Sequence, residues 1–124
     1  MKVIEAKDES FNRKTLERKE CTVLLSPEKN TSKDTIKKID SGLNEVLARI
    51  ASKNNISIGI DISDISSLPK DKKAIRLTKI IQNIVLCRKS KTRMLIKGPK
   101  EASHLMLSLG ASTKQAKEAV TQDF

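Results

Sequence analysis

The chain has 124 residues, of which 25 are Lys or Arg and 15 are Asp or Glu, so its formal net charge is +10 with the single histidine neutral. This length accommodates one core, and we expect residues 1–124 to form a single domain. With 37% apolar residues the chain can bury a core, which argues against a disordered tail. The excess of positive charge favours a polyanionic partner.

The content of aromatic residues and cysteines excludes further classes of protein. The chain has no Trp or Tyr, which argues against proteins that stack single-stranded bases on aromatic side chains. Cys21 and Cys87 have no second Cys or His at metal-ligand or redox spacing, so we expect buried thiols in a reducing compartment. No apolar run approaches the roughly 20 residues of a membrane span. We therefore expect a cytoplasmic protein without membrane contact.

The first half of the chain predicts two strand–helix units. Residues 2–6 predict a strand, followed by a polar helix over 11–19. Residues 21–25 predict a second strand, which Ser26-Pro27 ends because proline removes a ladder donor. Apolar residues at helical spacing, including Ile36 and Ile39, then predict a helix within 30–54. It is either one long helix through Gly42 or a shorter helix over 43–53, capped by Asp40-Ser41-Gly42.

The second half repeats this order. Isoleucines at every second position from 56 to 62 predict a strand with one apolar face. Residues 70–89 predict a helix, 93–96 a fourth strand, 101–109 a short helix, and residues from 112 a last helix. The buried stripe of the helix over 70–89 is predicted to contain Ala74, Leu77, Ile81, Ile84 and Val85 or Arg88. The whole pattern predicts an α/β fold of parallel strand–helix repeats.

Positive charge on the helix over 70–89 is the strongest functional signal. Lys72, Arg76 and Lys79 lie at i, i+4 and i+7, so they share one helix face, and we predict that they bind phosphates. No Asp or Glu occurs between positions 72 and 100, and the positive charge continues through Arg88, Lys89, Lys91, Arg93, Lys97 and Lys100. The alternative is an ordinary solvated helix surface. A basic cluster with so few acidic residues favours binding to a polyanion over the solvated surface.

Catalytic groups are scarce. His104, inside an amphipathic helix, is the only histidine, which is too few for a metal-dependent phosphoesterase. Asp61 and Asp64 follow the isoleucine strand and are placed either to hold a cation or to cap their own loop. There is no catalytic triad spacing and no glycine-rich phosphate loop. We expect no catalytic residues, no metal and no cofactor on this chain.

Several segments together resemble archaeal ribonuclease P protein component 3, the family of the thirty-kilodalton-type subunit. The most specific segment is 40–60, where a capped helix with Ala48-Arg49 on its middle turn leads into the alternating strand. The matching segments are residues 12–14, 22–28, 40–51, 53–60 and 109–112, with Ala116, Ala119 and Val120.

The resemblance implies a TIM-barrel-like scaffold of the metallophosphoesterase-related type, without the metal site of those enzymes. It implies a subunit that assists the catalytic RNA in removing the 5′ leader of precursor tRNA, paired with protein component 2, with magnesium on the RNA. Arg13 and Arg49 match the family's Asn-Arg and Ala-Arg positions and are candidates for RNA or partner contact. Against the family pattern we expect two departures: this sequence starts inside the family's chain, without its upstream strand–helix units, and the loop at residues 98–100 is shorter than the Arg-containing segment of relatives.

The count of strands predicts an incomplete barrel. A closed barrel takes eight strand–helix units over about 250 residues, and this sequence predicts four. Open sheet edges are prone to pairing, so we expect a partner protein or self-association to cover them. Two other functions stay open at this point: a divergent metal-dependent phosphoesterase, and a basic module that binds nucleic acids or acidic proteins in general.

Overall fold

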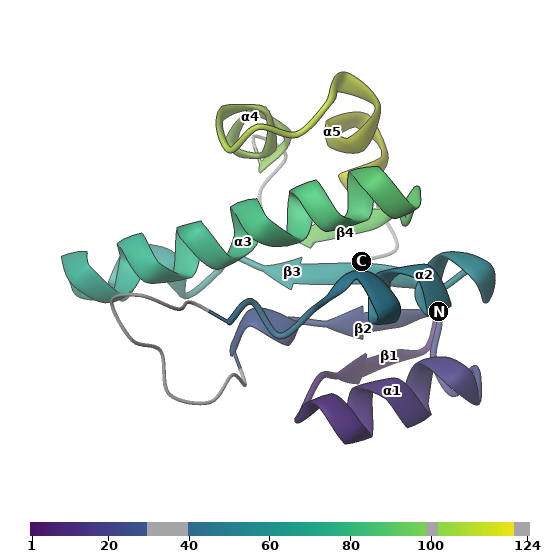
Figure 1. The fold of residues 1–124 in the computed structure, drawn as a ribbon. Helices are drawn as coiled ribbons and strands as arrows, with labels where there is room; N and C mark the ends of the chain where they lie inside the picture. The colour runs from purple at the N-terminus through teal and green to yellow at the C-terminus, as the bar shows by residue number, and fades with distance from the viewer. Residues whose placement is uncertain (30–39, 99–101, 121–124) are drawn as a thin grey trace.

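The computed structural model describes residues 1–29, 40–98 and 102–120, which form a parallel sheet with helices packed against it (Figure 1). The strands are β1 (Val3–Glu5), β2 (Val23–Leu25), β3 (Ser57–Asp61) and β4 (Met94–Lys97). They pair in the order β1-β2-β3-β4, each parallel to its neighbour in sequence. The predicted α/β fold of parallel strand–helix repeats is confirmed.

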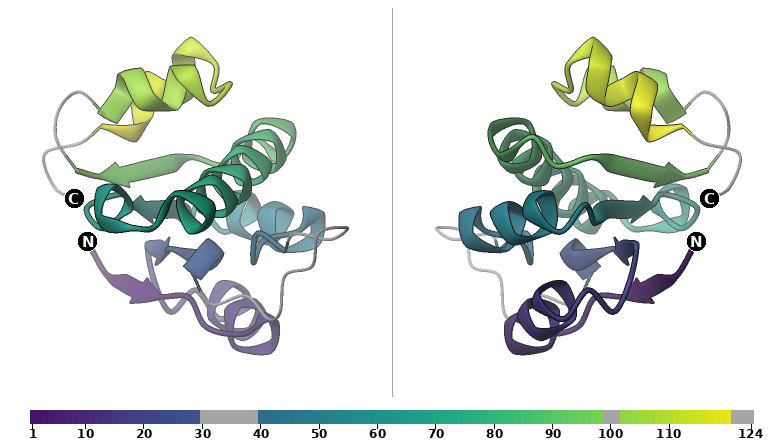
Figure 2. Two further views of the ribbon diagram at one scale, coloured as in Figure 1. Left: turned by 90° about the vertical axis from the view of Figure 1, so that its left-hand side faces the viewer. Right: turned by 90° about the vertical axis from the view of Figure 1, so that its right-hand side faces the viewer.

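The first three α-helices lie on the same face of the sheet, as the two side views in Figure 2 show. The core lies between this face and the helices, where Leu24, Ile58 and Ile60 of the strands pack with Leu47 and Ile84. The helices are α1 (Glu9–Glu17), α2 (Glu45–Lys53), α3 (Lys70–Ser90), α4 (Ala102–Ser108) and α5 (Thr113–Ala119), with the 3₁₀ turns η1 (Pro27–Lys29) and η2 (Ile65–Ser67). None of the described helices is long and apolar enough to cross a bilayer.

The start of α2 decides between the two helices predicted for this segment. Gly42 has a positive φ of 79°, a conformation that a helix cannot contain, so the shorter helix is correct. Its N-cap is Asn44, whose side chain accepts a hydrogen bond from the Leu47 amide, rather than the predicted Asp40-Ser41-Gly42. The predicted positions of Ile36 and Ile39 lie outside the described residues.

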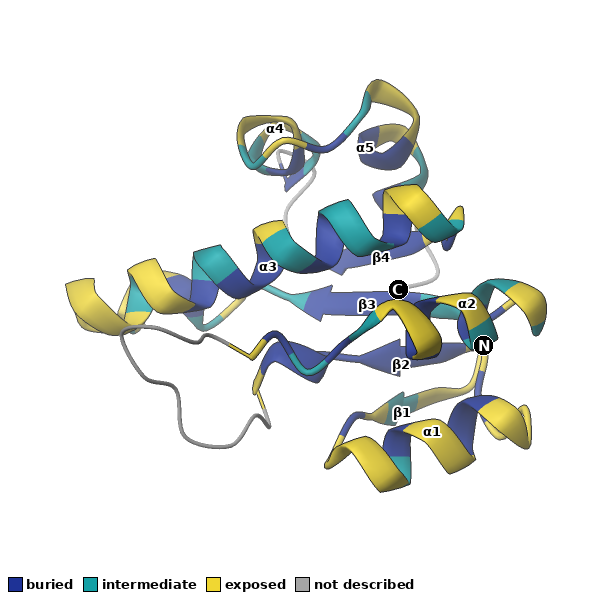
Figure 3. Cartoon of the chain, viewed as in Figure 1, coloured by how far each residue is buried: buried dark blue, intermediate teal, exposed yellow. Residues whose placement is uncertain are grey.

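Helix α3 has the predicted length but buries a different face. Of the predicted stripe only Ile84 is fully buried, whereas Ala74, Ile81 and Arg88 are exposed (Figure 3). The buried residues are Arg76, Lys79, Ile80, Asn83, Ile84 and Cys87. Because apolar residues occur on more than one side of α3, their spacing fits two orientations of the helix. The observed orientation places buried polar residues of α3 beside polar groups at the ends of the strands.

The two cysteines are free and buried, as predicted. Burial raises the pKa of Cys87 to about 12 and also raises the pKa of Cys21. Since the thiolate is the reactive form, we expect neither thiol to react with a disulfide reagent at mildly alkaline pH in the folded chain, and both to react in urea. Absorbance of the released thiol measures this directly. Rapid modification of Cys87 in the folded chain would contradict the packing of α3.

Candidate nucleic-acid interface

The basic residues predicted to form one phosphate-binding surface fall into two groups at opposite ends of the sheet. Helix α3 rises about 1.5 Å per residue, so Lys72 and Arg88 are about 24 Å apart along its axis. Lys72 lies near the carboxyl ends of the strands, whereas Arg88 lies near the start of β4. The predicted basic residues therefore gather at two separate places in the fold.

A carboxyl-end cluster surrounds the first half of α3. It lines a cavity of about 400 Å³ between η1 and α3, into which Lys72 contributes an exposed side chain. Arg76 and Lys79 are each only 7% exposed, so the predicted phosphate-binding face is turned inward. We define the carboxyl-end cluster as Glu28, Lys29, Asp64, Lys72, Arg76 and Lys79.

Arg76 is held by acidic groups from two loops. Its Nη2 lies 3.3 Å from Glu28 Oε1, and its Nη1 donates to Asp64 Oδ2 at 3.1 Å. Nη2 also donates to the Asp61 carbonyl at 2.8 Å. These bonds connect the loops after β2 and β3 to α3. Arg76 is therefore a structural residue that clamps three elements, and its contact with RNA stays a prediction.

Glu28 is the most deeply buried charged group of the cluster, with a fully buried side chain. Burial raises the pKa of its carboxyl group, against the opposing effect of Arg76. Glu28 Oε2 and the hydroxyl of the neighbouring Ser26 are buried without a hydrogen-bond partner. Ser26 also has a positive φ of 55°, which is unusual for a residue with a side chain. Strained backbone and unpaired polar atoms thus meet at the end of β2.

The two aspartates after β3 are engaged by protein groups. Asp61 accepts hydrogen bonds from the amide and hydroxyl of Ser63; burial raises its pKa, but these hydrogen bonds contribute to a net lowering. The hydrogen bond from Arg76 lowers the pKa of Asp64, and Lys29 Nζ lies 3.7 Å from Asp64 Oδ1. Within the described ranges no three His, Cys, Asp or Glu residues are grouped to hold a metal ion. Of the two roles considered for Asp61, the geometry fits loop capping.

An amino-end basic group lies at the opposite end of the sheet. Its members come from α2, the last turn of α3 and the residues before β4, and all are exposed: Arg49, Arg88, Lys89, Lys91 and Arg93. Arg88 Nη1 donates to the Gly110 carbonyl at 2.9 Å. Arg49 and Lys89 line one hollow together with Glu45, and Arg93 lines another beside Asn55. Exposed cations from three segments are what a phosphate backbone contacts.

The other predicted residues lie apart from both groups. Arg13 is exposed on α1, where its Nε donates to Glu17 at 2.7 Å. Lys97 is exposed at the carboxyl end of β4, opposite Asp61 in the sheet. Lys100 lies outside the described residues.

We expect Glu28→Gln to remove a defined part of the pH dependence of stability. Because burial raises the folded-state pKa of Glu28 above its ordinary value of 4.5, the folded chain binds this proton more tightly than the unfolded chain. The resulting stabilisation is present below pH 4.5 and is lost as the pH rises through the folded-state pKa. Glutamine does not titrate, so the difference in unfolding free energy, wild type minus variant, should fall over this window. Urea unfolding from acidic to neutral pH measures it, and a constant difference would contradict it.

Sequence reasoning missed Ser26, Glu28 and Lys29 as part of a site. Besides the resemblance over residues 22–28, the only local signal for them was the Ser26-Pro27 turn, which marks the end of a strand and carries no information about burial. Glu28 is adjacent to Arg76 in space and 48 positions away in sequence, so its partner was not visible in the local pattern.

No family model matches the chain. Ribonuclease P protein component 3 of Methanococcus vannielii is 37% identical over 93 residues, which are 75% of this chain and 37% of that protein. A chain in a cryo-EM structure of archaeal ribonuclease P with mature tRNA has the same fold, with a TM-score of 0.75 and 23% identity over 94% of this chain and 51% of that chain.

The chain thus spans about half of its structural neighbour and a smaller share of its curated relative. The sequence match covers most of the chain, and the fold match covers nearly all of it. The chain is a homologue of ribonuclease P protein component 3, matched over 37% of that protein's length.

Proposed function

We propose that the chain is an RNA-binding part of ribonuclease P, which assists the catalytic RNA in removing the 5′ leader of precursor tRNA. Its homology to component 3 supports this role. The observation that carries the proposal is the amino-end basic group, in which three segments of the chain present exposed cations together. Neutralising RNA phosphates with such cations releases counterions, which favours binding of any structured RNA.

In this proposal the chain performs no hydrolysis. Magnesium bound to the RNA would activate the attacking water and stabilise the leaving oxygen. Asp61 and Asp64 already accept hydrogen bonds from Ser63 and Arg76, which argues against the phosphoesterase alternative. The role of the chain is to bind and orient RNA.

We further propose that residues 1–124 form one domain and correspond to part of a TIM-like barrel of the metallophosphoesterase-related type. The strands follow chain order, all neighbours are parallel, and the first three α-helices cover one face, as in a (β/α)₈ barrel. The structural neighbour is about twice as long as this chain. Ribonuclease P protein component 2, or a second copy of the chain, would then cover the outer edges of β1 and β4.

Reconstitution tests this function. The full chain is added to ribonuclease P RNA and component 2, and precursor-tRNA cleavage is measured at low magnesium concentration. We expect the chain to raise the cleavage rate, because added positive charge lowers the magnesium that the RNA needs for its active fold. An unrelated structured RNA serves as competitor: equal affinity for both RNAs would favour the generic basic module, and an unchanged cleavage rate would rule out the proposal.

A further inference from the structure

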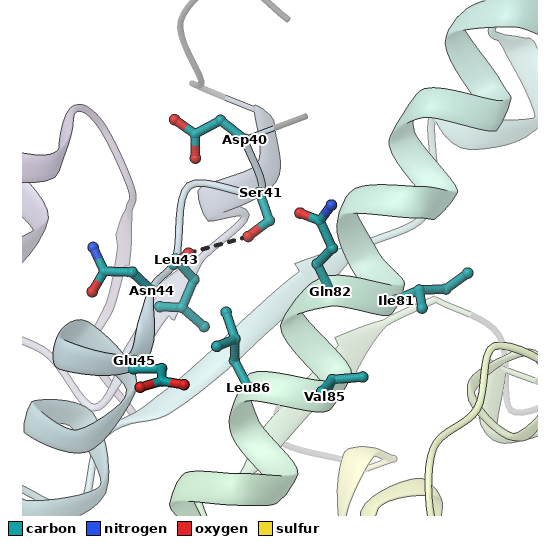
Figure 4. A pocket seen from close by; sticks show the side chains of 9 residues that line it. All are labelled: Asp40, Ser41, Leu43, Asn44, Glu45, Ile81, Gln82, Val85 and Leu86. Carbon is teal, nitrogen blue, oxygen red and sulfur yellow. Dashed lines mark hydrogen bonds between the residues drawn. The ribbon is translucent and has the colours of Figure 1, made fainter. Parts of the chain in front are cut away.

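A shallow groove separates the start of α2 from the outer side of α3 (Figure 4). It adjoins the hollow lined by Arg49 and Lys89, with which it shares Glu45 and Leu86. It has a volume of about 540 Å³. Leu43 and Leu86 point toward one another across it, and Ile81 and Val85 extend along the outer side of α3. The remaining lining residues are polar: Asp40, Ser41, Asn44, Glu45 and Gln82.

The groove explains the apolar side chains that α3 does not bury. Ile80 and Ile84 of the inner side are buried in the core, yet Ile81 is 39% exposed and Val85 is only half-buried. A helix with apolar residues on opposite sides is typical of one that packs between two partners. The core is one of them, and no described element covers Ile81.

The charge of the groove is opposite to that of the chain. Two carboxylates line it, from Asp40 and Glu45, and none of its lining residues is Lys or Arg, although the chain carries +10. Asp40 Oδ1 accepts a hydrogen bond from the Gly42 amide, which fixes this carboxylate at one end. Glu45 Oε2 lies 3.9 Å from Arg49, an exposed pair of little energetic weight. Acidic oxygens repel phosphates, so RNA does not fit here.

We propose that this groove docks a protein segment whose apolar side chains are flanked by Lys or Arg. The apolar side chains would cover Leu43, Ile81 and Leu86, and the cations would face the carboxylates of Asp40 and Glu45. An amphipathic helix combines both features at helical spacing, which matches a groove beside a helix. The inference stands on the groove alone and does not depend on RNA binding.

Two labelled helical peptides test this docking site by fluorescence anisotropy at roughly physiological salt. Both carry Leu at i, i+3, i+4 and i+7; one has Lys at the other positions and the second has Glu. The net charge of +10 alone would favour the Glu peptide, whereas the groove favours the Lys peptide. We expect the Lys peptide to bind more tightly, and tighter binding of the Glu peptide would overturn the proposal.

Variants then locate the binding. Replacing Ile81 and Val85 with Ser should weaken binding of the Lys peptide by about tenfold or more, and adding Glu45→Lys should weaken this binding further. The matched control is Leu107→Ser, which removes a 48% exposed leucine from α4 and should leave binding unchanged. Unchanged binding in the Ile81/Val85 variant, with an unaltered unfolding curve, would overturn the proposal. So would sedimentation showing a dimer of this chain that the same variant dissociates, because the occupant would then be a second copy.

Discussion

Replacing Arg76 with Ala is expected to lower the free energy of unfolding by about 3–5 kcal/mol. The change leaves the fully buried Glu28 carboxylate without its cationic partner, which lies 3.3 Å away in the intact chain. It also removes the hydrogen bonds to Asp64 and to the Asp61 carbonyl. Small domains are stable by only about 5–15 kcal/mol, so this loss is a large fraction of the total stability. Urea unfolding followed by circular dichroism measures the loss.

Two further variants separate the clamp from a general loss of charge. Lys89→Ala removes an exposed cation from the same helix and should change stability by less than about 0.5 kcal/mol. The double variant Glu28→Leu, Arg76→Met removes both charges together and should recover much of the loss, because no unpaired charge stays buried. If Arg76→Ala unfolds at the same urea concentration as the wild type, Arg76 is not the clamp described above.

Arg76 also illustrates what sequence periodicity can and cannot determine. Spacing at i, i+4 and i+7 correctly placed Lys72, Arg76 and Lys79 on one side of α3. It could not tell which side faces the sheet, because Ile75 and Ile81 give other sides of the helix apolar character. In this orientation Arg76 forms ion pairs with Glu28 and Asp64, which lie on the loops after β2 and β3.

Local signals, in contrast, predicted the strands well. The alternation of isoleucines before position 62 identified β3, and β-branched residues identified β2. Gly42 indicated the interruption before α2, although the cap is Asn44. These features depend on neighbours in sequence, whereas the site depends on residues that are distant in sequence and adjacent only at the ends of the strands.

Because the basic residues lie in two separate groups, only some substitutions can test RNA binding. Substituting Lys72, Arg76, Lys79 and Arg88 together would break the buried clamp, so reduced RNA binding would reflect unfolding as much as lost contacts. A test of RNA contact therefore has to avoid the carboxyl-end cluster. The amino-end basic group suits this purpose because each member is exposed.

Substituting four members of the amino-end basic group with Ala should weaken binding to ribonuclease P RNA by about a hundredfold to a thousandfold at physiological salt. The four are Arg88, Lys89, Lys91 and Arg93. Each phosphate contact that is lost should also reduce the slope of log affinity against log salt by about 0.9, since fewer counterions are released. Filter binding over a range of salt concentrations gives both quantities, and the unfolding curve confirms that the variant is folded.

The matched control removes the same number of charges elsewhere. Its four Ala substitutions are at exposed positions on or next to α1 and α5: Lys14, Arg18, Lys114 and Lys117. Both variants have the same net charge, so a long-range effect of charge would weaken RNA binding equally in both. A shallower salt slope in the first variant alone would place the phosphates at the amino-end basic group. Equal slopes would mean that the +10 charge acts as a whole, which is the behaviour of a generic basic module.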